Sequence, residues 1–346
     1  MPLPFLTSEW PGVGGVLKQD PEDFVVEEIP TYQPCGEGEH LFLWIEKRGV
    51  AAEQLSRHIA HTLNLKPMDV GVAGLKDRHA ITRQFVSVPA AACSDPSILE
   101  TECIRVLRSE RHTNKLKTGH LRGNRFEIVL RETHPEAAEL ALPIAERVSA
   151  VGFPNYYGEQ RFGRDGDNLA LGLQLLRGEK SSDDIPRSRR KFLLRFALST
   201  VQSELFNQTL ANRVTDGEIT QVMLGDVMQV VASGGVFSVE DVATEQTRFE
   251  QGETVITGPM FGPKMRNPVG VPAEREASVL RDADLSDADF RRFKKLTPGT
   301  RRPFLIRPEQ LQVEPVADGP GLKFRFSLPS GVYATTLLRE FQKPPA

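Results

Sequence analysis

Alternation of apolar and polar residues predicts a group of short β-strands in the first 135 residues of the chain. Each predicted strand is rich in β-branched and aromatic residues and is bounded by Gly, Pro or Asp. The segments are DFVVEEIP (23–30), HLFLWIEKRG (40–49), QFVSVP (84–89), CIRVLRSE (103–110) and RFEIVLRET (125–133). We expect the last two to form a second pair of strands. From about Pro303 the strand pattern returns, and it leads to a final helix.

Apolar residues at helical spacing predict helices between these groups of strands. Residues 51–65 place Leu55, Ile59 and Leu63 on one face, and residues 135–152 offer Gly152 as a C-cap. The chain is then mostly helical from 153 to about 300. Helices are expected at 167–178, 187–214 and 284–296, with short strands and turns at 226–239 and 253–268. Because a β-rich part resumes after a helical middle, we predict an α+β protein with an insertion inside one domain.

Composition is typical of an ordinary globular protein. Of the 346 residues, 39% are hydrophobic and 26% are charged, which excludes collagen-like and wholly disordered chains. Three cysteines without a C-x-x-C spacing exclude a disulfide framework and favour a reduced, intracellular protein. The sequence lacks the pattern of a signal peptide, and its apolar runs fall far short of the roughly 20 residues that span a bilayer. We therefore expect a water-soluble, cytoplasmic protein that contacts no membrane.

The net charge of −3 hides a segregation of charge along the chain. Residues 1–30 contain six acids and one base, whereas residues 105–125 contain seven bases and one acid. Two further basic clusters, at 187–195 and 291–302, contain no acid. Such clusters are often only solvated surface, but bases that share one face bind a polyanion because their field is local. We predict that the three clusters form one positive cleft that binds nucleic acid, with the acidic stretch off its path.

The first candidate for chemistry is VAGLKDRHAITRQ (72–84), in which a strand leads into a turn and a second strand. Asp77 lies in that turn between Lys76 and Arg78. Nearby positive charge favours the carboxylate, so Asp77 is expected to stay ionised and to suit a nucleophile or a general base. Taken alone, an Asp in a Gly-containing hairpin is more often a turn residue.

The second candidate is KTGHLRGNRFEIVL (117–130), at the start of a predicted strand. Strand geometry places Asn124 and Phe126 on one face and Arg125 on the other. An amide beside an aromatic ring suits recognition of uracil, by hydrogen bonds to the base edge and stacking on its face. The plainer interpretation is that Phe126 belongs to the core and that Asn124 is a turn amide.

Signals for a metal or a nucleotide cofactor are weak. Within the Gly-rich loop 152–168, Asp165 and Asp167 lack EF-hand spacing, and capping of the next helix explains them better. His58 and His61 lie at i, i+3 without a third ligand nearby, so zinc is not expected. The sequence contains no G-x-S-x-G, G-x-x-x-x-G-K-[ST] or H-E-x-x-H string, which argues against elbow hydrolases, P-loop NTPases and zincins.

Taken in order, several strings of the sequence resemble the tRNA pseudouridine synthase D family, which modifies uridine 13. They are DFVVEE (23–28), AGLKDRHAITRQ (73–84), LRGNRFEIVLR (121–131), FPNYYGEQRFG (153–163) and FSLPSGVYATTLLRE (326–340). The resemblance extends from near residue 18 to near residue 340. It implies a catalytic domain with the mixed β-sheet of pseudouridine synthases, in two parts at 1–152 and 303–346. Residues 153–302 would form the inserted, mainly helical α+β domain of this family.

The resemblance also implies roles for single residues. Asp77 in GLKDR matches the catalytic aspartate of the family, and Phe126 matches the aromatic residue expected to stack on the uracil. Further matches to substrate-binding positions are Phe24, Asn124, Tyr333 and Lys18. The family pattern has Phe where this chain has Tyr333. The ring is kept, so stacking should survive, but the added hydroxyl needs a partner if it is buried.

The implied reaction breaks the N1–C1′ bond of a uridine, turns the uracil and joins C5 to C1′. It adds no atoms and changes no oxidation state, so we expect no NAD, metal or ATP, with tRNA as the partner and a monomer favoured. Asp77 would either attack C1′ or remove a proton from C2′. Two alternatives stay open. One is a glycosidase-like hydrolase with Asp77 and Glu27 or Glu28 as its carboxylate pair, and the other is a non-catalytic RNA-binding protein.

Overall fold

The computed structural model describes residues 2–158, 161–162 and 167–343, and its fold is of the predicted α+β class. A large mixed sheet lies at its centre. The strands of this sheet are β1 (Gly14–Leu17), β2 (Phe24–Pro30), β3 (His40–Arg48), β4 (Gly71–Val72), β5 (Ile81–Pro89), β6 (Ile104–His112), β7 (Leu121–Thr133), β14 (Glu309–Pro315) and β15 (Gly321–Pro329). Their order is β14-β15-β7-β2-β5-β3-β6, with β1 beside β7 and β4 beside β5. Strands β2 and β5 run parallel, and the other pairs are antiparallel.

Two smaller sheets and the helices complete the fold. The order β10-β9-β11-β12 describes a four-stranded sheet, and β8 pairs with β13. These strands are β8 (Phe153–Pro154), β9 (Val227–Val230), β10 (Val236–Ser238), β11 (Thr254–Met260), β12 (Thr300–Pro303) and β13 (Leu305–Ile306). The helices are α1 (Ala52–Thr62), α2 (Ala137–Val151), α3 (Asp167–Arg177), α4 (Arg190–Thr215), α5 (Val242–Glu250), α6 (Val271–Asp282), α7 (Asp287–Arg292) and α8 (Ala334–Gln342).

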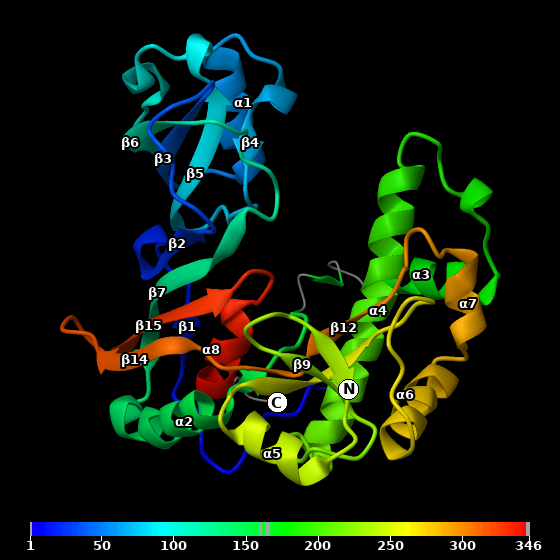
Figure 1. Ribbon diagram of the computed structural model, residues 1–346. Coiled ribbons are helices and arrows are strands. Elements are labelled where there is room, and N and C mark those ends of the chain that lie inside the picture. Colours follow the sequence, from blue (N-terminus) through cyan, green and yellow to red (C-terminus); the bar gives the residue numbers. More distant parts are fainter. Residues whose placement is uncertain (1, 159–160, 163–166, 344–346) are drawn as a thin grey trace.

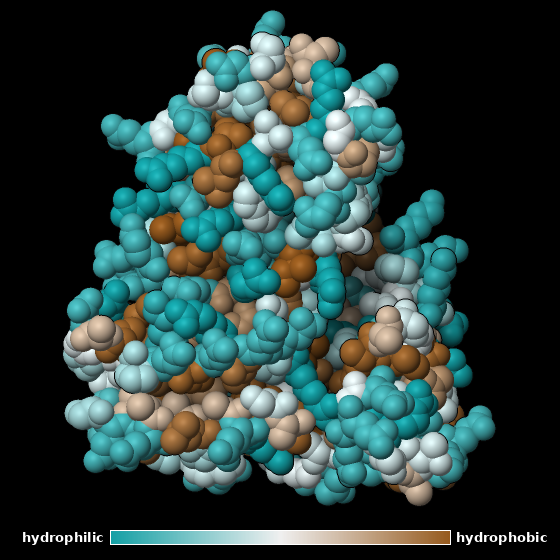
Figure 2. All heavy atoms as spheres, turned by 60° about the vertical axis from the view of Figure 1, so that its left-hand side comes forward, coloured by the Kyte–Doolittle hydropathy of each residue, from teal (hydrophilic) through white to brown (hydrophobic). Residues whose placement is uncertain are grey.

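The elements form two lobes that rise from a common base, as Figure 1 shows. One lobe contains β3, β5, β6 and α1, and the other contains α3, α4 and α7. Strands β7 and β15 and helix α8 lie in the base below the first lobe (Figure 1). Figure 2 shows that the molecule stays indented beside the first lobe when all heavy atoms are drawn.

The base is held together by residues from both ends of the chain. One hydrophobic cluster contains Phe24 of β2, Ile128 of β7 and Ile144 of α2 together with Phe324 of β15 and Phe341 of α8, all of them buried. Burial of apolar surface contributes about 25 cal/mol per Å², so such a cluster binds the two ends firmly to each other. The helices α3, α4, α6 and α7 share a separate cluster. Within the described residues, none of the helices is both long enough and apolar enough to cross a membrane.

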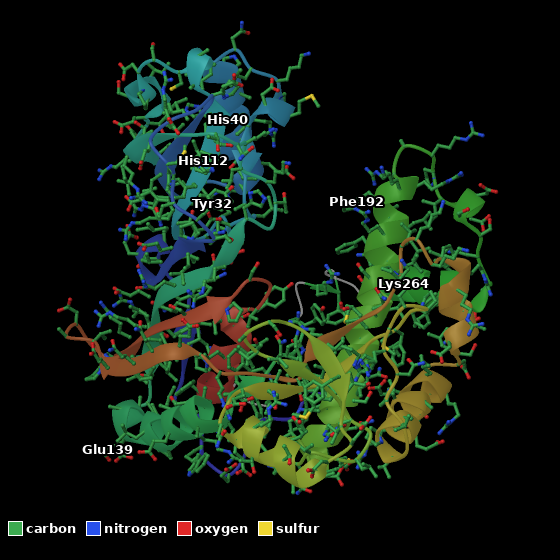
Figure 3. All side chains as sticks on the ribbon, viewed as in Figure 1. Tyr32, His40, His112, Glu139, Phe192 and Lys264 are labelled. Atoms are coloured by element: carbon green, nitrogen blue, oxygen red, sulfur yellow. The ribbon has the colours of Figure 1, made fainter. Side chains whose placement is uncertain are left out.

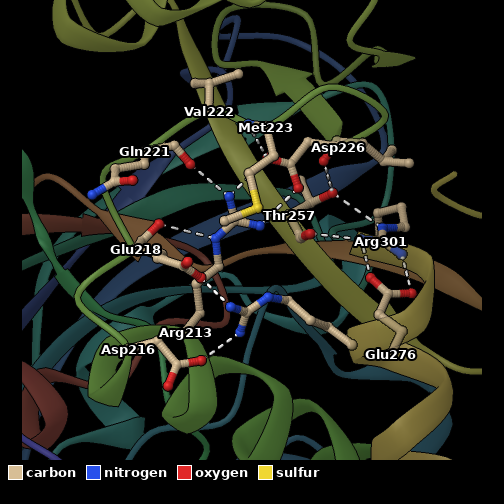
Figure 4. A network of polar contacts seen from close by, with 12 residues as sticks. Arg213, Asp216, Glu218, Gln221, Val222, Met223, Asp226, Thr257, Glu276 and Arg301 are labelled. Atoms are coloured by element: carbon tan, nitrogen blue, oxygen red, sulfur yellow. Dashed lines mark hydrogen bonds and ion pairs between the residues drawn. The ribbon is translucent and has the colours of Figure 1, made fainter. Parts of the chain in front are cut away.

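Buried ion pairs stabilise the segment around β11 and β12 (Figure 4). Arg213 of α4 donates two hydrogen bonds to the Asp226 carboxylate, each 2.7 Å long. Arg301 of β12 donates two to Glu276 of α6, at 2.7 and 2.9 Å. Bidentate geometry of this kind satisfies both charged groups away from water.

Most predicted elements are confirmed, but the structure corrects two predictions and adds two helices. The segments 103–110 and 125–133 are strands β6 and β7, yet they do not pair with each other, because β6 pairs with β3 and β7 with β2, β15 and β1. The helix expected at 284–296 is shorter, since α7 covers Asp287–Arg292. Helices α5 and α6 were not predicted. Gly152 caps α2 as expected, with a φ of 94° that favours glycine.

Candidate active site

Five of the six predicted site residues, all except Lys18, line one pocket of about 390 Å³ in the base of the molecule. Its wall is formed by β2, the start of β7 and the loops that precede β5, β7 and α8. Among the lining residues are Phe24, Asp77, Asn124, Phe126 and Tyr333. These residues are widely separated in the sequence, so the sheet and the packing of α8 against it bring them together.

Two aromatic rings form the floor of the pocket and are fixed by their neighbours. Phe24 and Phe126 are 3% and 6% exposed, and their rings meet edge to face at 6.4 Å between centroids. Phe126 also stacks on Phe326 of β15, at 5.3 Å. Edge-to-face and offset-stacked pairs are the favoured arrangements of aromatic rings. The rings are therefore held in place before any ligand arrives.

Asn124 lines the pocket and carries a side-chain oxygen that has no hydrogen-bond partner among the described residues. This atom, Oδ1, is buried. Arg125 points to the other side of β7, where its Nη1 donates to Glu27 at 3.1 Å, as the strand alternation predicted. Gly123 allows β15 to approach β7 closely, because a Cβ atom there would lie 2.3 Å from the Leu328 carbonyl oxygen. A buried, unpaired amide oxygen costs free energy unless a ligand satisfies it.

Asp77 is partnered by a lysine that lies far away in the sequence. Lys18 Nζ donates to Asp77 Oδ2 at 2.8 Å, and the same ammonium group lies 4.4 Å from the centroid of the Phe24 ring. The Asp77 side chain is 48% exposed and the Lys18 side chain 22%. The carboxylate is thus held by a cation on one side and open to the pocket on the other.

The neighbouring Lys76 has a different partner from the one that the sequence suggested. Its Nζ lies 2.5 Å from Glu28 Oε1, and both side chains are buried. The second carboxylate oxygen of Glu28 accepts the backbone N–H of Phe85 at 3.2 Å. Burial raises the pKa of Glu28, and the Lys76 ammonium opposes that rise. The pair therefore anchors the loop that carries Asp77 to the sheet, instead of flanking the Asp77 carboxylate.

Lys47 is a residue of the site that sequence reasoning missed. It is fully buried, and its Nζ donates to the backbone carbonyls of Asp77 and Val50 at 2.9 and 2.7 Å. Burial lowers the pKa of Lys47 to about 8, and the Asp77 carboxylate opposes that shift. The signal was present in the strand alternation, because Lys47 follows the buried Leu43 and Ile45 on the same face of β3.

The loop before α8 carries Tyr333 and meets the segment around β12. The Tyr333 carbonyl accepts the Thr336 hydroxyl at 2.6 Å, which fixes the first turn of the helix. Arg302 of β12 donates to Asn155 Oδ1 at 2.6 Å, and its Nη2 lies 3.5 Å from the Gly331 carbonyl oxygen. Burial lowers the pKa of the Arg302 guanidinium. The residues at 302 and 331 thus connect the helical segment to the pocket.

The three basic clusters are not uniformly available to a polyanion, which corrects one prediction. Arg301 is 8% exposed and binds Glu276 in the interior. Arg190 is half-buried and forms an ion pair with Asp183 at 3.0 Å. These two arginines are part of the protein's own structure, so only the remaining bases of their clusters can face a ligand.

Other candidates do not form a site in the part of the chain that is described. No three His, Cys, Asp or Glu side chains there gather as they would around a metal ion. His58 Nε2 lies 2.9 Å from the Leu99 carbonyl oxygen. Asp167 is the first residue of α3, whereas Asp165 lies outside the described residues.

Comparison with known proteins identifies the family. The family model described as tRNA pseudouridine synthase D matches residues 3–183 and 187–341. A tRNA pseudouridine synthase D from Anaeromyxobacter dehalogenans is 43% identical over 344 residues, which cover 99% of this chain and 97% of that protein. One from Thermus thermophilus is 40% identical over 341 residues, which cover 98% of this chain and 92% of that protein. The chain belongs to the tRNA pseudouridine synthase D family.

A solved structure shows the same fold. It is the crystal structure of a protein from Methanosarcina mazei with the provisional name tRNA pseudouridine synthase D. The TM-score is 0.81 over 99% of this chain and 96% of that one, at 24% sequence identity. At this identity the match supports the fold and not the individual residues of the site.

Proposed function

We propose that this protein converts uridine 13 of tRNA to pseudouridine, with Asp77 as the essential carboxylate. The observation that carries the proposal is the composition of the pocket, whose lining includes Asp77, aromatic rings and Asn124 with its unpartnered Oδ1. Aromatic faces and an amide are the groups that recognise an unstacked base. A carboxylate next to them is placed for chemistry on the attached sugar.

The proposed reaction begins when the target nucleotide leaves its stack, at a cost of a few kcal/mol. Stacking against Phe24, Phe126 and Tyr333 offsets that cost, and Asn124 Oδ1 accepts the N3–H of the uracil. Asp77 then attacks C1′ or removes the C2′ proton, and the N1–C1′ bond breaks. The uracil turns, and C5 bonds to C1′ as the Asp77–C1′ bond breaks or, on the second route, as Asp77 returns the proton to C2′. The C5 proton then leaves to solvent and N1 takes up a proton. Atoms and electrons balance without a co-reactant, so we propose that the protein acts without a cofactor.

Lys18 is proposed to position the reacting carboxylate. Its ammonium group contacts Asp77 Oδ2, which leaves the other carboxylate oxygen, Oδ1, for the sugar. Lys18 also packs on Phe24, so the carboxylate and the aromatic floor are linked through one side chain.

A base-releasing hydrolase is less well supported. A glycosidase of that kind needs two carboxylates at the reacting bond. Among the described residues that line the pocket, Asp77 is the only one with a carboxylate. Glu28 binds Lys76, and Glu27 pairs with Arg125 and Arg83.

We also propose the division into a catalytic domain of residues 1–152 and 303–346 and an inserted domain of 153–302, acting as a monomer. The cluster shared by β2, β7, β15 and α8 supports the joining of the two outer segments. The separate cluster of α3, α4, α6 and α7 supports the inserted unit.

The direct test incubates the protein with tRNA that carries tritium at C5 of its uridines. Formation of pseudouridine releases that tritium to water, and chemical mapping locates the product in the chain. We expect release from one site, position 13, and none from a control tRNA with cytidine at that position. Free uracil would instead indicate the hydrolase, and tRNA binding without tritium release would indicate a non-catalytic RNA-binding protein.

A further inference from the structure

A row of alternating aromatic and guanidinium groups extends along the side of α4. Phe192 and Phe196 are stacked with centroids 5.8 Å apart and planes 6° from parallel. The Arg161 guanidinium lies 5.8 Å from the Phe196 ring and 5.7 Å from the Tyr157 ring. Arg302 covers Tyr157 at 4.2 Å. Each neighbour in the row is within the distance of a cation–π or stacking contact.

The inner end of the row lies beside a residue that lines the pocket. Arg302 Nη2 lies 3.5 Å from the carbonyl oxygen of Gly331, and Gly331 lines the pocket together with Asp77. Ser203 of α4 accepts a hydrogen bond from Arg161 Nε at 3.3 Å, which fixes the middle of the row on the helix. The row is therefore continuous from the outer part of α4 to the neighbourhood of Gly331.

The outer end of the row is an exposed ring. Phe192 is 67% exposed, and Figure 3 labels it near the outer end of α4, on the side facing the lobe that carries Tyr32 and His112. Arg195 and Phe196 follow at i+3 and i+4, on the same face of the helix. Exposing a phenyl ring to water is unfavourable, so a partner that covers the ring gains free energy of binding.

Basic residues surround the exposed ring. Four exposed bases lie in the 187–195 segment, and none of them pairs with a carboxylate among the described residues; they are Arg187, Arg189, Lys191 and Arg195. Exposed cations beside a flat aromatic face are complementary to a strand that carries phosphates and unstacked bases. The positive charge of these four residues favours RNA over an apolar segment of another protein as the ligand.

We infer that the exposed Phe192 ring, at the outer end of this row, is a stacking site for the unpaired bases of an RNA strand that leads to the pocket. The inference rests on the proposed function, because that function supplies RNA as the ligand. Every base has a π-face, so the site is tolerant of sequence and selects single-stranded over paired RNA. A paired base has no free face to offer to the Phe192 ring.

The test measures binding of a non-self-complementary RNA of roughly 12 nucleotides, within the range of single-strand sites, and of the same RNA as a duplex. Phe192→Ala and Phe192→Leu should raise the Kd for the single strand by about 5- to 150-fold. Phe192→Tyr should keep the wild-type Kd, and none of the three should change the Kd for the duplex. Leu142→Ala, which removes another exposed apolar side chain on α2, is the matched control.

Two further readouts separate stacking from charge. The slope of log Kd against log salt concentration should be unchanged in the Phe192 variants, whereas Arg189→Ala with Lys191→Ala should flatten it by about 0.7 per lost phosphate contact. Phe192→Trp should show tryptophan quenching on addition of the single strand, beyond the change seen in the wild type.

Equal Kd values for all Phe192 variants, or no added quenching, would overturn the inference. A wild-type dimer in sedimentation that Phe192→Ala converts to a monomer would overturn it as well, because the ring would then serve a second copy of the chain. Pseudouridine formation is measured on the same wild-type sample. If the wild type forms pseudouridine but the Kd does not depend on Phe192, only this inference is contradicted. If binding depends on Phe192 but no pseudouridine forms, only the proposed function is contradicted.

Discussion

Replacing Lys47 by Met should lower kcat while the affinity for tRNA changes little. The ammonium group donates to the backbone carbonyls of Asp77 and Val50, so its removal frees the backbone that carries the Asp77 carboxylate. A shift of about 1 Å at a reacting group costs about 10²-fold in rate. We therefore expect kcat on tRNA to fall by about 10²-fold, with little change in the Kd for tRNA.

The loss of stability is limited because two contributions oppose each other. Two carbonyls lose their donor, at about 1–3 kcal/mol each. Removing the lysine also relieves the cost of burying its charge. That cost is seen in the pKa of Lys47, which burial lowers from 10.5 to about 8. That shift corresponds to at most about 3 kcal/mol, and less where water screens the amine. We expect a net loss of about 3 kcal/mol or less in the free energy of unfolding at pH 7.

The pH dependence has a definite sign. The pKa of Lys47 is about 8 in the folded state and close to 10.5 in the unfolded chain, so between these values the unfolded state binds more protons. The stability that this group contributes therefore rises with pH through that window. Urea unfolding at several pH values should show the deficit of Lys47→Met growing from about pH 8 to about pH 10.5.

Lys180→Met, at an exposed lysine, is the control and should match the wild type in kcat and in unfolding. A Lys47→Met protein with wild-type kcat would refute the role of Lys47 in positioning Asp77. A deficit in stability that shrinks as the pH rises would refute the assignment of the lowered pKa.

Other substitutions test the remaining parts of the site and fold. Lys18→Met should lower kcat by about 10²-fold with an unchanged Kd for tRNA, because it removes a preorganised charge beside the reacting carboxylate; a changed Kd alone would contradict this. Tyr333→Phe should keep the wild-type rate and Tyr333→Ala should slow turnover by about 5- to 150-fold, because the ring and not the hydroxyl stacks. Single-turnover kinetics measure both rates. A Phe variant slower than the Ala variant would exclude stacking as the role of Tyr333. Arg301→Met should cost about 3–5 kcal/mol in urea unfolding by leaving Glu276 charged in the interior, and Arg301→Met with Glu276→Leu should recover most of it. An unaltered unfolding midpoint in Arg301→Met would contradict the buried pair.

The sequence predicted the elements whose pattern is local. Strands β2, β3 and β5 and helices α1, α2 and α4 have clear periodicity, and the structure has them within a few residues of the expected bounds. Strand pairing was not predictable in the same way, because β7 pairs with β15 from nearly the other end of the chain. Helix α5 is short, and its one local signal is Asp241, whose side chain accepts the N–H groups of Ala243 and Thr244.

The candidate site shows the same division. Asp77, Asn124 and Phe126 were identifiable from short strings of sequence, and the structure places them in one pocket. The partners of the charged groups were not identifiable, because Lys18 meets Asp77 and Lys76 meets Glu28 only after the sheet has formed. Charge counts along the chain also miss burial, which is why some arginines of the basic clusters proved to be internal.

The most direct measurement of the central claim compares Asp77→Asn with the wild type on the same tRNA. Tritium release from C5 reports the isomerisation, and a filter-binding Kd reports the affinity for tRNA. One small carboxylate among many basic contacts contributes chemistry and not affinity, so we expect the rate to fall by more than about a thousandfold while the Kd stays within about twofold. A variant that retains more than about a thousandth of the wild-type rate would show that Asp77 is neither the nucleophile nor the proton-abstracting group.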